Sequence, residues 1–227
     1  MPTIVIASPK GGTGKSTVAV ILATEMALLD IPVTILDTDP NLSVTRWANA
    51  AKLPNGIQVI GDITESNIIK MIREHEGDGK IVIVDPEGIA SRKMSRAITQ
   101  ADLVITPMRP TSLDADIGAE IINLIEEEEE ALGRKIQLAV AFTMTSNTII
   151  SMQERGIHES LVSQGVDVIE CKLALRSAYS ALFATGGNLY TMPPQGNMEA
   201  AKANAKRFAE TVLIRLEKGN TNDPTQK

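Results

Sequence analysis

A glycine-rich segment at residues 10–17 constrains this chain most, because it stands directly between an apolar run and a helical pattern. The run, residues 3–7, is short and mostly apolar, as in a strand buried on both faces of a sheet. The segment reads Lys-Gly-Gly-Thr-Gly-Lys-Ser-Thr, and its glycines let backbone N–H groups approach an anion without Cβ clashes. A helix that begins near Ser16 would point the positive end of its dipole at the same anion. The sequence therefore predicts a phosphate-binding loop that joins a strand to a helix.

Short apolar runs alternate with helical patterns along the rest of the chain, which is typical of a parallel sheet covered by helices on both faces. The further strands are expected at residues 33–36, 57–60, 80–85, 103–106, 137–142 and 166–170. We therefore predict an α/β fold with a doubly wound, mostly parallel, twisted sheet. With no internal repeat and no domain boundary in the pattern, residues 1–217 are expected to form a single domain. Its last helix is expected at residues 198–216, and the polar residues 218–227 are expected to be a disordered tail.

Composition narrows the class of protein. A single cysteine, Cys171, excludes an intramolecular disulfide and fits a reducing cytoplasm. No apolar run approaches the roughly 20 residues that span a bilayer, and no basic stretch precedes the first strand, so neither a membrane span nor a signal peptide is expected. The net charge of −6 argues against a protein coated in nucleic acid, although a local basic patch could still bind it.

The loop departs from the strict phosphate-binding pattern G-x-x-x-x-G-K-[ST], because Pro9 holds the first glycine position and an extra lysine, Lys10, follows it. Lys15 is expected to neutralise the β- and γ-phosphates of a nucleotide, and the Ser16 hydroxyl to ligate Mg²⁺. ATP and Mg²⁺ are therefore the predicted cofactors. The predicted nucleotide contacts in the loop are Lys10, Gly11, Gly12, Thr13, Gly14, Lys15, Ser16 and Thr17.

Acidic residues end two of the expected strands. Asp37 and Asp39 close the second strand within Asp-Thr-Asp-Pro-Asn, and Asp85 closes the strand at residues 80–85. Carboxylates at the carboxyl end of a strand lie beside the phosphate loop in an open α/β sheet. Either Asp37 or Asp39 could instead cap the helix that follows. The role of Glu87, just beyond Asp85, stays open.

The lysine-bearing loop resembles the deviant Walker A loop of the ParA/MinD ATPases, a group of P-loop proteins. In that group this lysine reaches across a dimer interface to the partner's nucleotide, so the resemblance implies an ATP-driven dimer with Lys10 acting like an arginine finger. By the family pattern, Asp39 would orient or activate the attacking water, and Asp37 would serve the Mg²⁺ shell. Asp85 would end the Walker B strand and hold Mg²⁺ through a water.

Other segments are similar to the small plasmid-partition ParA proteins that lack an N-terminal helix-turn-helix domain. Residues 37–47 read Asp-Thr-Asp-Pro-Asn-Leu-Ser-Val-Thr-Arg-Trp, and residues 106–114 resemble the family's P-x-x-P-[ST]-x-L-D loop near the nucleotide and the dimer face. Arg176-Ser-Ala-Tyr matches a late family pattern. Thr143 and Met144 stand where the family places base-contacting residues, although a core methionine is an equal alternative.

The resemblance implies a cytoplasmic bacterial partition ATPase associated with the nucleoid. ATP binding would favour a homodimer that grips nonspecific DNA or assembles further on it, and a small dimeric centromere-binding protein would stimulate hydrolysis. The candidate DNA contacts are Arg176, Lys202, Lys206 and Arg207, and ordinary solvated helix residues are the alternative for each. Such binding should weaken steeply with salt.

Three other functions stay open at this stage. A ParA-like ATPase of a conjugative or T-DNA transfer system shares the same motifs. Membrane-bound placement like that of MinD needs a basic amphipathic helix at the C-terminus, which the polar tail does not supply, so no membrane partner is expected. A metabolic enzyme on the same scaffold would be a carboxylate ligase, for which no substrate pocket is evident, or an iron–sulfur reductase, which needs paired cysteines that Cys171 cannot supply.

Two further features have two interpretations each. Trp47, the one tryptophan, is expected to pack in the core, with a contact to a partner as the alternative. The acidic run at residues 126–130 is expected to be a solvated helix face, with a docking site for a basic partner as the alternative.

Overall fold

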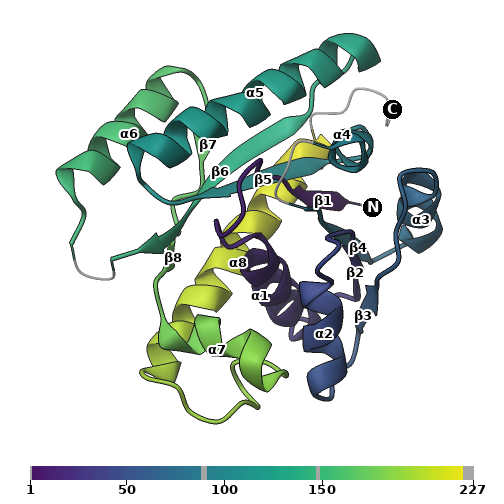
Figure 1. Cartoon of the computed structure of the whole chain (residues 1–227), viewed down its shortest axis with the longest axis vertical. Coiled ribbons are helices and arrows are strands. Elements are labelled where there is room, and N and C mark those ends of the chain that lie inside the picture. The colour runs from purple at the N-terminus through teal and green to yellow at the C-terminus, as the bar shows by residue number, and fades with distance from the viewer. Residues whose placement is uncertain (1, 88–90, 147–148, 222–227) are drawn as a thin grey trace.

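The computed structural model describes residues 2–87, 91–146 and 149–221, which alternate strands with helices (Figure 1). The strands are β1 (Thr3–Ile6), β2 (Val33–Asp37), β3 (Ile57–Ile60), β4 (Ile81–Asp85), β5 (Leu103–Met108), β6 (Gln137–Thr145), β7 (Asp167–Val168) and β8 (Leu173–Ala174). The helices are α1 (Lys15–Ala27), α2 (Ser43–Ala50), α3 (Ile68–His75), α4 (Arg92–Ile98), α5 (Ser112–Leu132), α6 (Met152–Ser163), α7 (Ser177–Thr185) and α8 (Met198–Thr221).

The strands form one sheet in the order β3-β2-β4-β1-β5-β6-β7, with β8 paired to β6. Every strand pair in the described part of the chain is parallel. The chain leaves β1 toward β2 on one side and later passes to β5 on the other side, so the order reverses around β1. Ligands of open α/β sheets bind outside the carboxyl ends of the strands at such a reversal, and the glycine-rich loop follows β1 at this edge.

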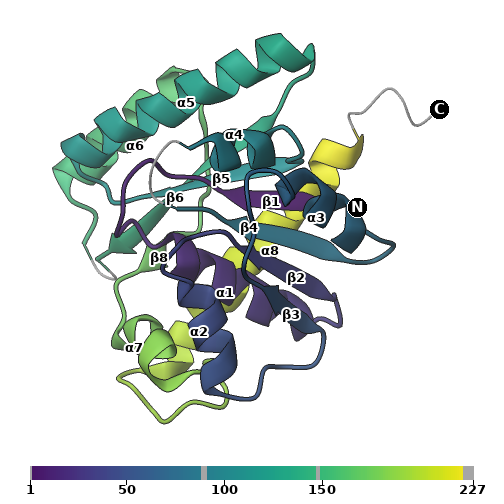
Figure 2. The same ribbon diagram turned by 45° about the vertical axis from the view of Figure 1, so that its right-hand side comes forward.

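Helices cover both faces of the sheet, as the strand patterns predict (Figure 2). Ile4 and Ile6 of β1 pack on one face in a cluster with residues of α1, α2, α7 and α8, while Val5 packs on the other face with residues of α3, α4 and α5. Successive side chains of a strand point to opposite faces, so a strand buried on both faces must be apolar throughout. The predicted doubly wound α/β fold is confirmed. None of the described helices has the length and apolar character of a bilayer span.

The last helix ends later than predicted. α8 continues to Thr221, past the expected end at residue 216, so residues 218–221 of the predicted disordered tail are helical. Each residue added to an existing helix gains a backbone hydrogen bond without a new nucleus, so poor helix formers at its end cost little. The rest of the predicted tail, residues 222–227, lies outside the described residues.

The last strands differ most from the prediction. The strand expected at residues 166–170 is reduced to the two residues of β7, and β8, also of two residues, has no sequence signal at all. Two-residue strands are shorter than the apolar alternation that identifies a strand. The strand expected at residues 137–142 continues to Thr145 as β6.

Trp47 is a core residue, as predicted. Its side chain is fully buried, and its indole Nε1–H donates to the Gly187 carbonyl oxygen at 2.7 Å. The acidic run of α5 is mostly exposed, as predicted for a solvated face. Glu129 accepts hydrogen bonds from the Lys135 ammonium and the Ile136 N–H, so this carboxylate stabilises the turn after α5.

Candidate phosphate and metal site

The glycine-rich loop has the backbone conformation that its glycines permit. Gly12 and Gly14 have φ values of 77° and 92°, in the left-handed region that side chains with a Cβ rarely adopt. Gly14 is the N-cap of α1, so the free N–H groups of the first turn face the loop. A Cβ added at Gly12 would meet no atom within 4 Å, which leaves open space where an anion can approach the backbone. This geometry suits phosphate oxygens.

A hollow of about 630 Å³ opens over this loop. Its walls come from the loop and the start of α1, from the segment between β2 and α2, from Glu87 just beyond β4 and from Met144 of β6. The lining residues are Gly11, Gly12, Gly14, Lys15, Ser16, Thr17, Asp39, Pro40, Asn41, Ser43, Glu87 and Met144. The fold therefore brings six of the eight predicted loop contacts together with Asp39 and with Glu87, the acid whose role stayed open. The other predicted loop and metal residues, Lys10, Thr13, Asp37 and Asp85, do not line this hollow.

Lys15 lies at the floor of this hollow. Only 7% of it is exposed, and its Nζ donates to the Lys10 carbonyl oxygen at 3.2 Å. Burial lowers the pKa of its ammonium, while the carboxylates of Asp85 and Asp39 act in the opposite direction. A buried cation at the start of a helix attracts an anion strongly, because water screens it poorly.

The carboxylates of Asp37 and Asp85 fit a cation site. Both residues are fully buried, and Oδ1 of Asp37 and both carboxylate oxygens of Asp85 lack a hydrogen bond of good geometry, although the Ser16 hydroxyl lies close enough to Asp85 to favour its charged form. Burial raises the pKa of Asp37 and raises that of Asp85 to about 7, because the charged forms lose water. Buried acceptors without a donor are costly, and a cation with its bound waters would satisfy them.

Mg²⁺ at this place would need oxygens from another source as well. No group of three or more His, Cys, Asp or Glu side chains within the described ranges could hold a metal on its own. Mg²⁺ takes six oxygen ligands and is commonly bound by one or two carboxylates, water and substrate phosphates. The donor set of Ser16, Asp37 and Asp85 therefore fits Mg²⁺ that arrives with a nucleotide.

Asp37 also stabilises the helix that follows it. Its Oδ2 accepts hydrogen bonds from the backbone N–H and the hydroxyl of Thr45, at 2.8 and 2.9 Å. Asp37 is not the N-cap of α2, which is Leu42, but this oxygen accepts an N–H of the first turn, while the other oxygen stays available for a cation. Asp39 does not cap a helix: its Oδ1 accepts the N–H of Asn41 at 2.7 Å, in the turn that lines the hollow.

Lys10, the extra lysine of the loop, is paired within its own chain. Its Nζ donates to Oδ1 of Asp114 at 2.8 Å, and the side chain of Asp114 is 1% exposed. Arg109 binds the same carboxylate through its Nε at 2.8 Å and its backbone N–H at 3.1 Å. Although burial opposes ionisation, the hydrogen bonds from Arg109 and Lys10 hold the pKa of Asp114 below its usual value. The sequence showed the motif that contains Asp114, but not its contact with Lys10, because the two residues lie far apart in the chain.

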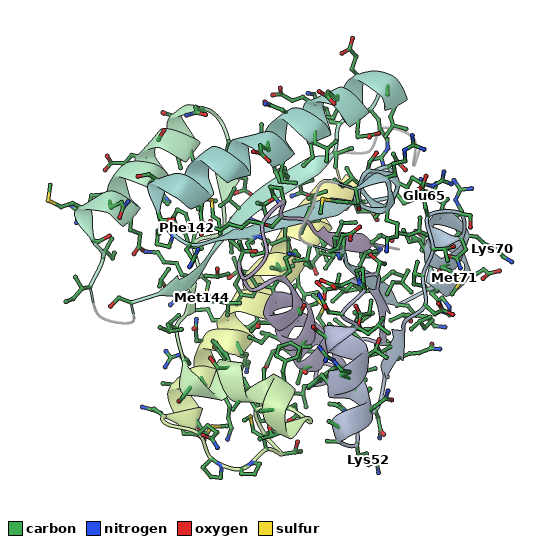
Figure 3. All side chains as sticks on the ribbon, viewed as in Figure 1. Lys52, Glu65, Lys70, Met71, Phe142 and Met144 are labelled. Atoms are coloured by element: carbon green, nitrogen blue, oxygen red, sulfur yellow. The ribbon has the colours of Figure 1, made fainter. Side chains whose placement is uncertain are left out.

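A second, smaller hollow adjoins the loop on the side of β6 and β8 and is mostly apolar. Thr143 lies at its wall, and its hydroxyl donates to the Thr13 carbonyl oxygen at 2.8 Å. Met144 has a φ of 53°, interrupts the pairing of β6 with β8, and is 40% exposed (Figure 3). The core-methionine alternative is therefore wrong. An apolar slot beside a phosphate loop suits a planar base.

The candidate DNA contacts do not share one surface hollow. Arg176 lines the apolar slot beside Gly14, and its Nε is buried without a hydrogen-bond partner. Arg207 lines a separate hollow next to Cys171. Lys202 and Lys206, on α8, are paired with the acids Glu199 and Glu210 at 2.9 and 3.9 Å. These pairs weaken the positive potential of α8.

Known proteins match this chain in sequence and in fold. Residues 4–221 match the family model of the CobQ/CobB/MinD/ParA nucleotide-binding domain. The chain is 56% identical to Protein ParA of Rhizobium radiobacter over 217 residues, which cover 95% of this chain and 98% of that protein.

Two solved structures share the fold. An McdA variant of Cyanothece in complex with ATP has a TM-score of 0.74 at 14% identity, covering 93% of this chain and 96% of that one. The pNOB8 ParA bound to nonspecific DNA has a TM-score of 0.62 at 16% identity, covering 96% of this chain and 99% of that one.

Proposed function

The chain belongs to the CobQ/CobB/MinD/ParA family of nucleotide-binding domains, and we propose that it is a ParA-type ATPase that acts in DNA segregation. One observation carries the proposal: Lys15, Ser16 and Asp39 line one hollow over the loop at the start of α1. The buried carboxylate of Asp85, whose residue pairs with Asp37 between β4 and β2, lies close enough to act on the charge of Lys15. Phosphoryl transfer needs this combination of phosphate positioning and charge neutralisation.

The loop and the carboxylates would divide the work on ATP. Lys15 and the N–H groups of residues 11–17 would hold the phosphates, and Thr143 and Met144 would border the base. Ser16, Asp37 and Asp85 would hold Mg²⁺, which neutralises charge on the phosphates when bound. Asp39, which lines the hollow, would orient the attacking water, and Lys10 would stabilise the transferring phosphoryl group of a second copy.

The relatives support the wider cycle. A 56% identical relative is named ParA, and a ParA of the same fold binds nonspecific DNA. In the proposed cycle, ATP drives a homodimer that binds nonspecific DNA in the cytoplasm. A small dimeric centromere-binding protein then stimulates hydrolysis and resets the monomer. Arg176, Lys202, Lys206 and Arg207 remain the proposed DNA contacts.

The decisive experiment is the molar mass of the Asp39→Ala variant by light scattering, first with ADP and then with ATP and Mg²⁺. The variant should bind ATP and accumulate as a dimer because it cannot complete hydrolysis, and it should be a monomer with ADP. Lys15→Ala in the Asp39→Ala background is the control and should stay monomeric in both nucleotides. A mass that does not respond to nucleotide in Asp39→Ala would overturn the proposed ATP-driven cycle.

A further inference from the structure

Lys93 on α4 makes a contact that the proposed function does not use. Its Nζ donates to the backbone carbonyl oxygen of Thr38 at 2.7 Å. The N–H of Thr38 donates to the carbonyl oxygen of Asp85 at 3.0 Å. Both backbone polar groups of Thr38 are therefore fixed, one by the end of β4 and the other by a cation from α4.

The contact holds a residue that lies between two acids of the candidate site. Thr38 is 2% exposed and lies between Asp37, which ends β2, and Asp39, which lines the hollow. The peptide group that begins with the Thr38 carbonyl carries the Asp39 Cα on its other side. A hydrogen bond from a charged donor is shorter and roughly twice as strong as a neutral one, so it fixes the orientation of that peptide group firmly.

Helix α4 does not need Lys93 for its own stability. Ser91 caps it, accepting the Met94 N–H at 3.2 Å, and Met94, Ala97 and Ile98 pack in the core. The Lys93 side chain is only partly buried, whereas its neighbour Arg92 has an 87% exposed side chain and pairs with Glu65 at 3.8 Å. Arg92 is therefore a matched control on the same helix.

We propose that Lys93 is a positioning residue for hydrolysis: it holds the Thr38 carbonyl so that the Asp39 carboxylate faces the nucleotide hollow. The inference rests on the proposed function, because it assumes that Asp39 orients the attacking water. Lys93 does not line the hollow with the phosphate loop, so it acts on turnover through Asp39 and leaves nucleotide binding to Lys15 and the loop.

The test compares Lys93→Met, Lys93→Arg and Arg92→Met with the unchanged chain, using phosphate release at saturating ATP and Mg²⁺ with nonspecific duplex DNA present. A misplacement of about 1 Å can cost about 100-fold in rate, so Lys93→Met should lower kcat about 10- to 100-fold. Its Kd for ATP, measured by titration calorimetry, should stay within about twofold, since its effect on binding is indirect. Lys93→Arg should recover most of the lost kcat, because a guanidinium can also donate to the carbonyl.

The outcomes separate the two proposals. An unchanged kcat in Lys93→Met, an equal loss in Arg92→Met, or a weakened Kd that accounts for the whole loss of rate would overturn the role of Lys93 alone. Absence of phosphate release by the unchanged chain, together with an Asp39→Ala mass that does not respond to ATP, would overturn the proposed function and this inference with it. If Lys93→Met does not fold, Lys93→Gln keeps a donor group of shorter reach, and it must then show the same loss of kcat at constant Kd.

Discussion

The two lysines of the glycine-rich loop lie five positions apart, yet the fold treats them in opposite ways. Lys15 is 7% exposed, at the start of α1, and its ammonium donates to a carbonyl oxygen of the loop. The side chain of Lys10 is 27% exposed, and its ammonium is paired with the carboxylate of Asp114, which Arg109 also binds. One lysine is buried without an ion pair among the described residues, and the other has a counter-ion in its own chain.

The difference is between a lysine that is already in place for a phosphate, Lys15, and a lysine that would first have to leave its ion pair, Lys10. Burial disfavours the charged form of Lys15, and the negative charge of a bound phosphate would stabilise that form. Lys15 already lies at the loop, so it does not have to move to bind the phosphate. Lys10 must leave Asp114 before it can act on any phosphate. When it leaves, Arg109 still neutralises Asp114, so the buried carboxylate does not stay unpaired.

The largest expected effect is on Lys15. Lys15→Ala removes a buried cation from the phosphate site and should weaken ATP binding by about 30- to 5,000-fold, because truncating one partner of a buried charge pair costs about 2–5 kcal/mol. Titration calorimetry with ATP and Mg²⁺ measures the loss. Lys52→Ala, at an exposed lysine away from the loop, is the control and should bind normally (Figure 3). Normal ATP affinity in Lys15→Ala would show that Lys15 does not hold the phosphates, and the contrast with Lys10 would then fail.

Lys10 should show the opposite pattern. Lys10→Gln should bind ATP within a few-fold of the unchanged chain, because the buried cation stays in place, but it should lose ATP-dependent dimerisation or turnover. Light scattering and phosphate release test the two properties separately. If Lys10→Gln keeps both ATP-dependent dimerisation and turnover, Lys10 is only a loop residue and its ion pair with Asp114 is structural.

The loop and the strand-end acids of the site could be predicted from the sequence, and the side-chain contacts between distant segments could not. Residues 10–17 form one continuous segment, Asp37 and Asp85 end paired strands of a parallel sheet, and Asp39 follows two residues after β2. Local pattern and topology therefore suffice to place them at one edge of the sheet. The contact of Lys10 with Asp114 spans 104 residues and that of Lys93 with Thr38 spans 55. Each depends on where the tip of a long side chain lies, which periodicity does not encode.

The fold shows the same difference between what a local pattern predicts and what depends on contacts with distant segments. The long apolar strands and the buried Trp47 follow from burial patterns, which a sequence displays directly. Strands β7 and β8, of two residues each, are set by pairing to β6 rather than by their own sequence. The positive φ of Met144 arises at the same irregular pairing, which is why its exposure beside the loop could not be predicted.

The smallest expected effect is on stability, at Asp114. Asp114→Asn leaves two cations beside a neutral group and should lower the free energy of unfolding at pH 7 by about 1–3 kcal/mol, the usual cost of removing one partner from a hydrogen-bonded charge. Urea unfolding measures it. Asp78→Asn, at an exposed aspartate, is the control and should change stability by less than about 0.5 kcal/mol.

The pH dependence of this effect tests whether the charge of Asp114 is responsible. Its pKa is lower in the folded protein than in the unfolded chain, so the unfolded state binds the proton more tightly and acid favours unfolding. The stabilisation is therefore complete above the ordinary aspartate pKa and is lost as the pH falls through the lower folded value. The difference between Asp114→Asn and the unchanged chain should shrink as the pH falls below about 4, the ordinary aspartate pKa. A difference that is constant with pH would mean that Asp114 stabilises the loop by shape alone, and that Lys10 is held without its counter-ion.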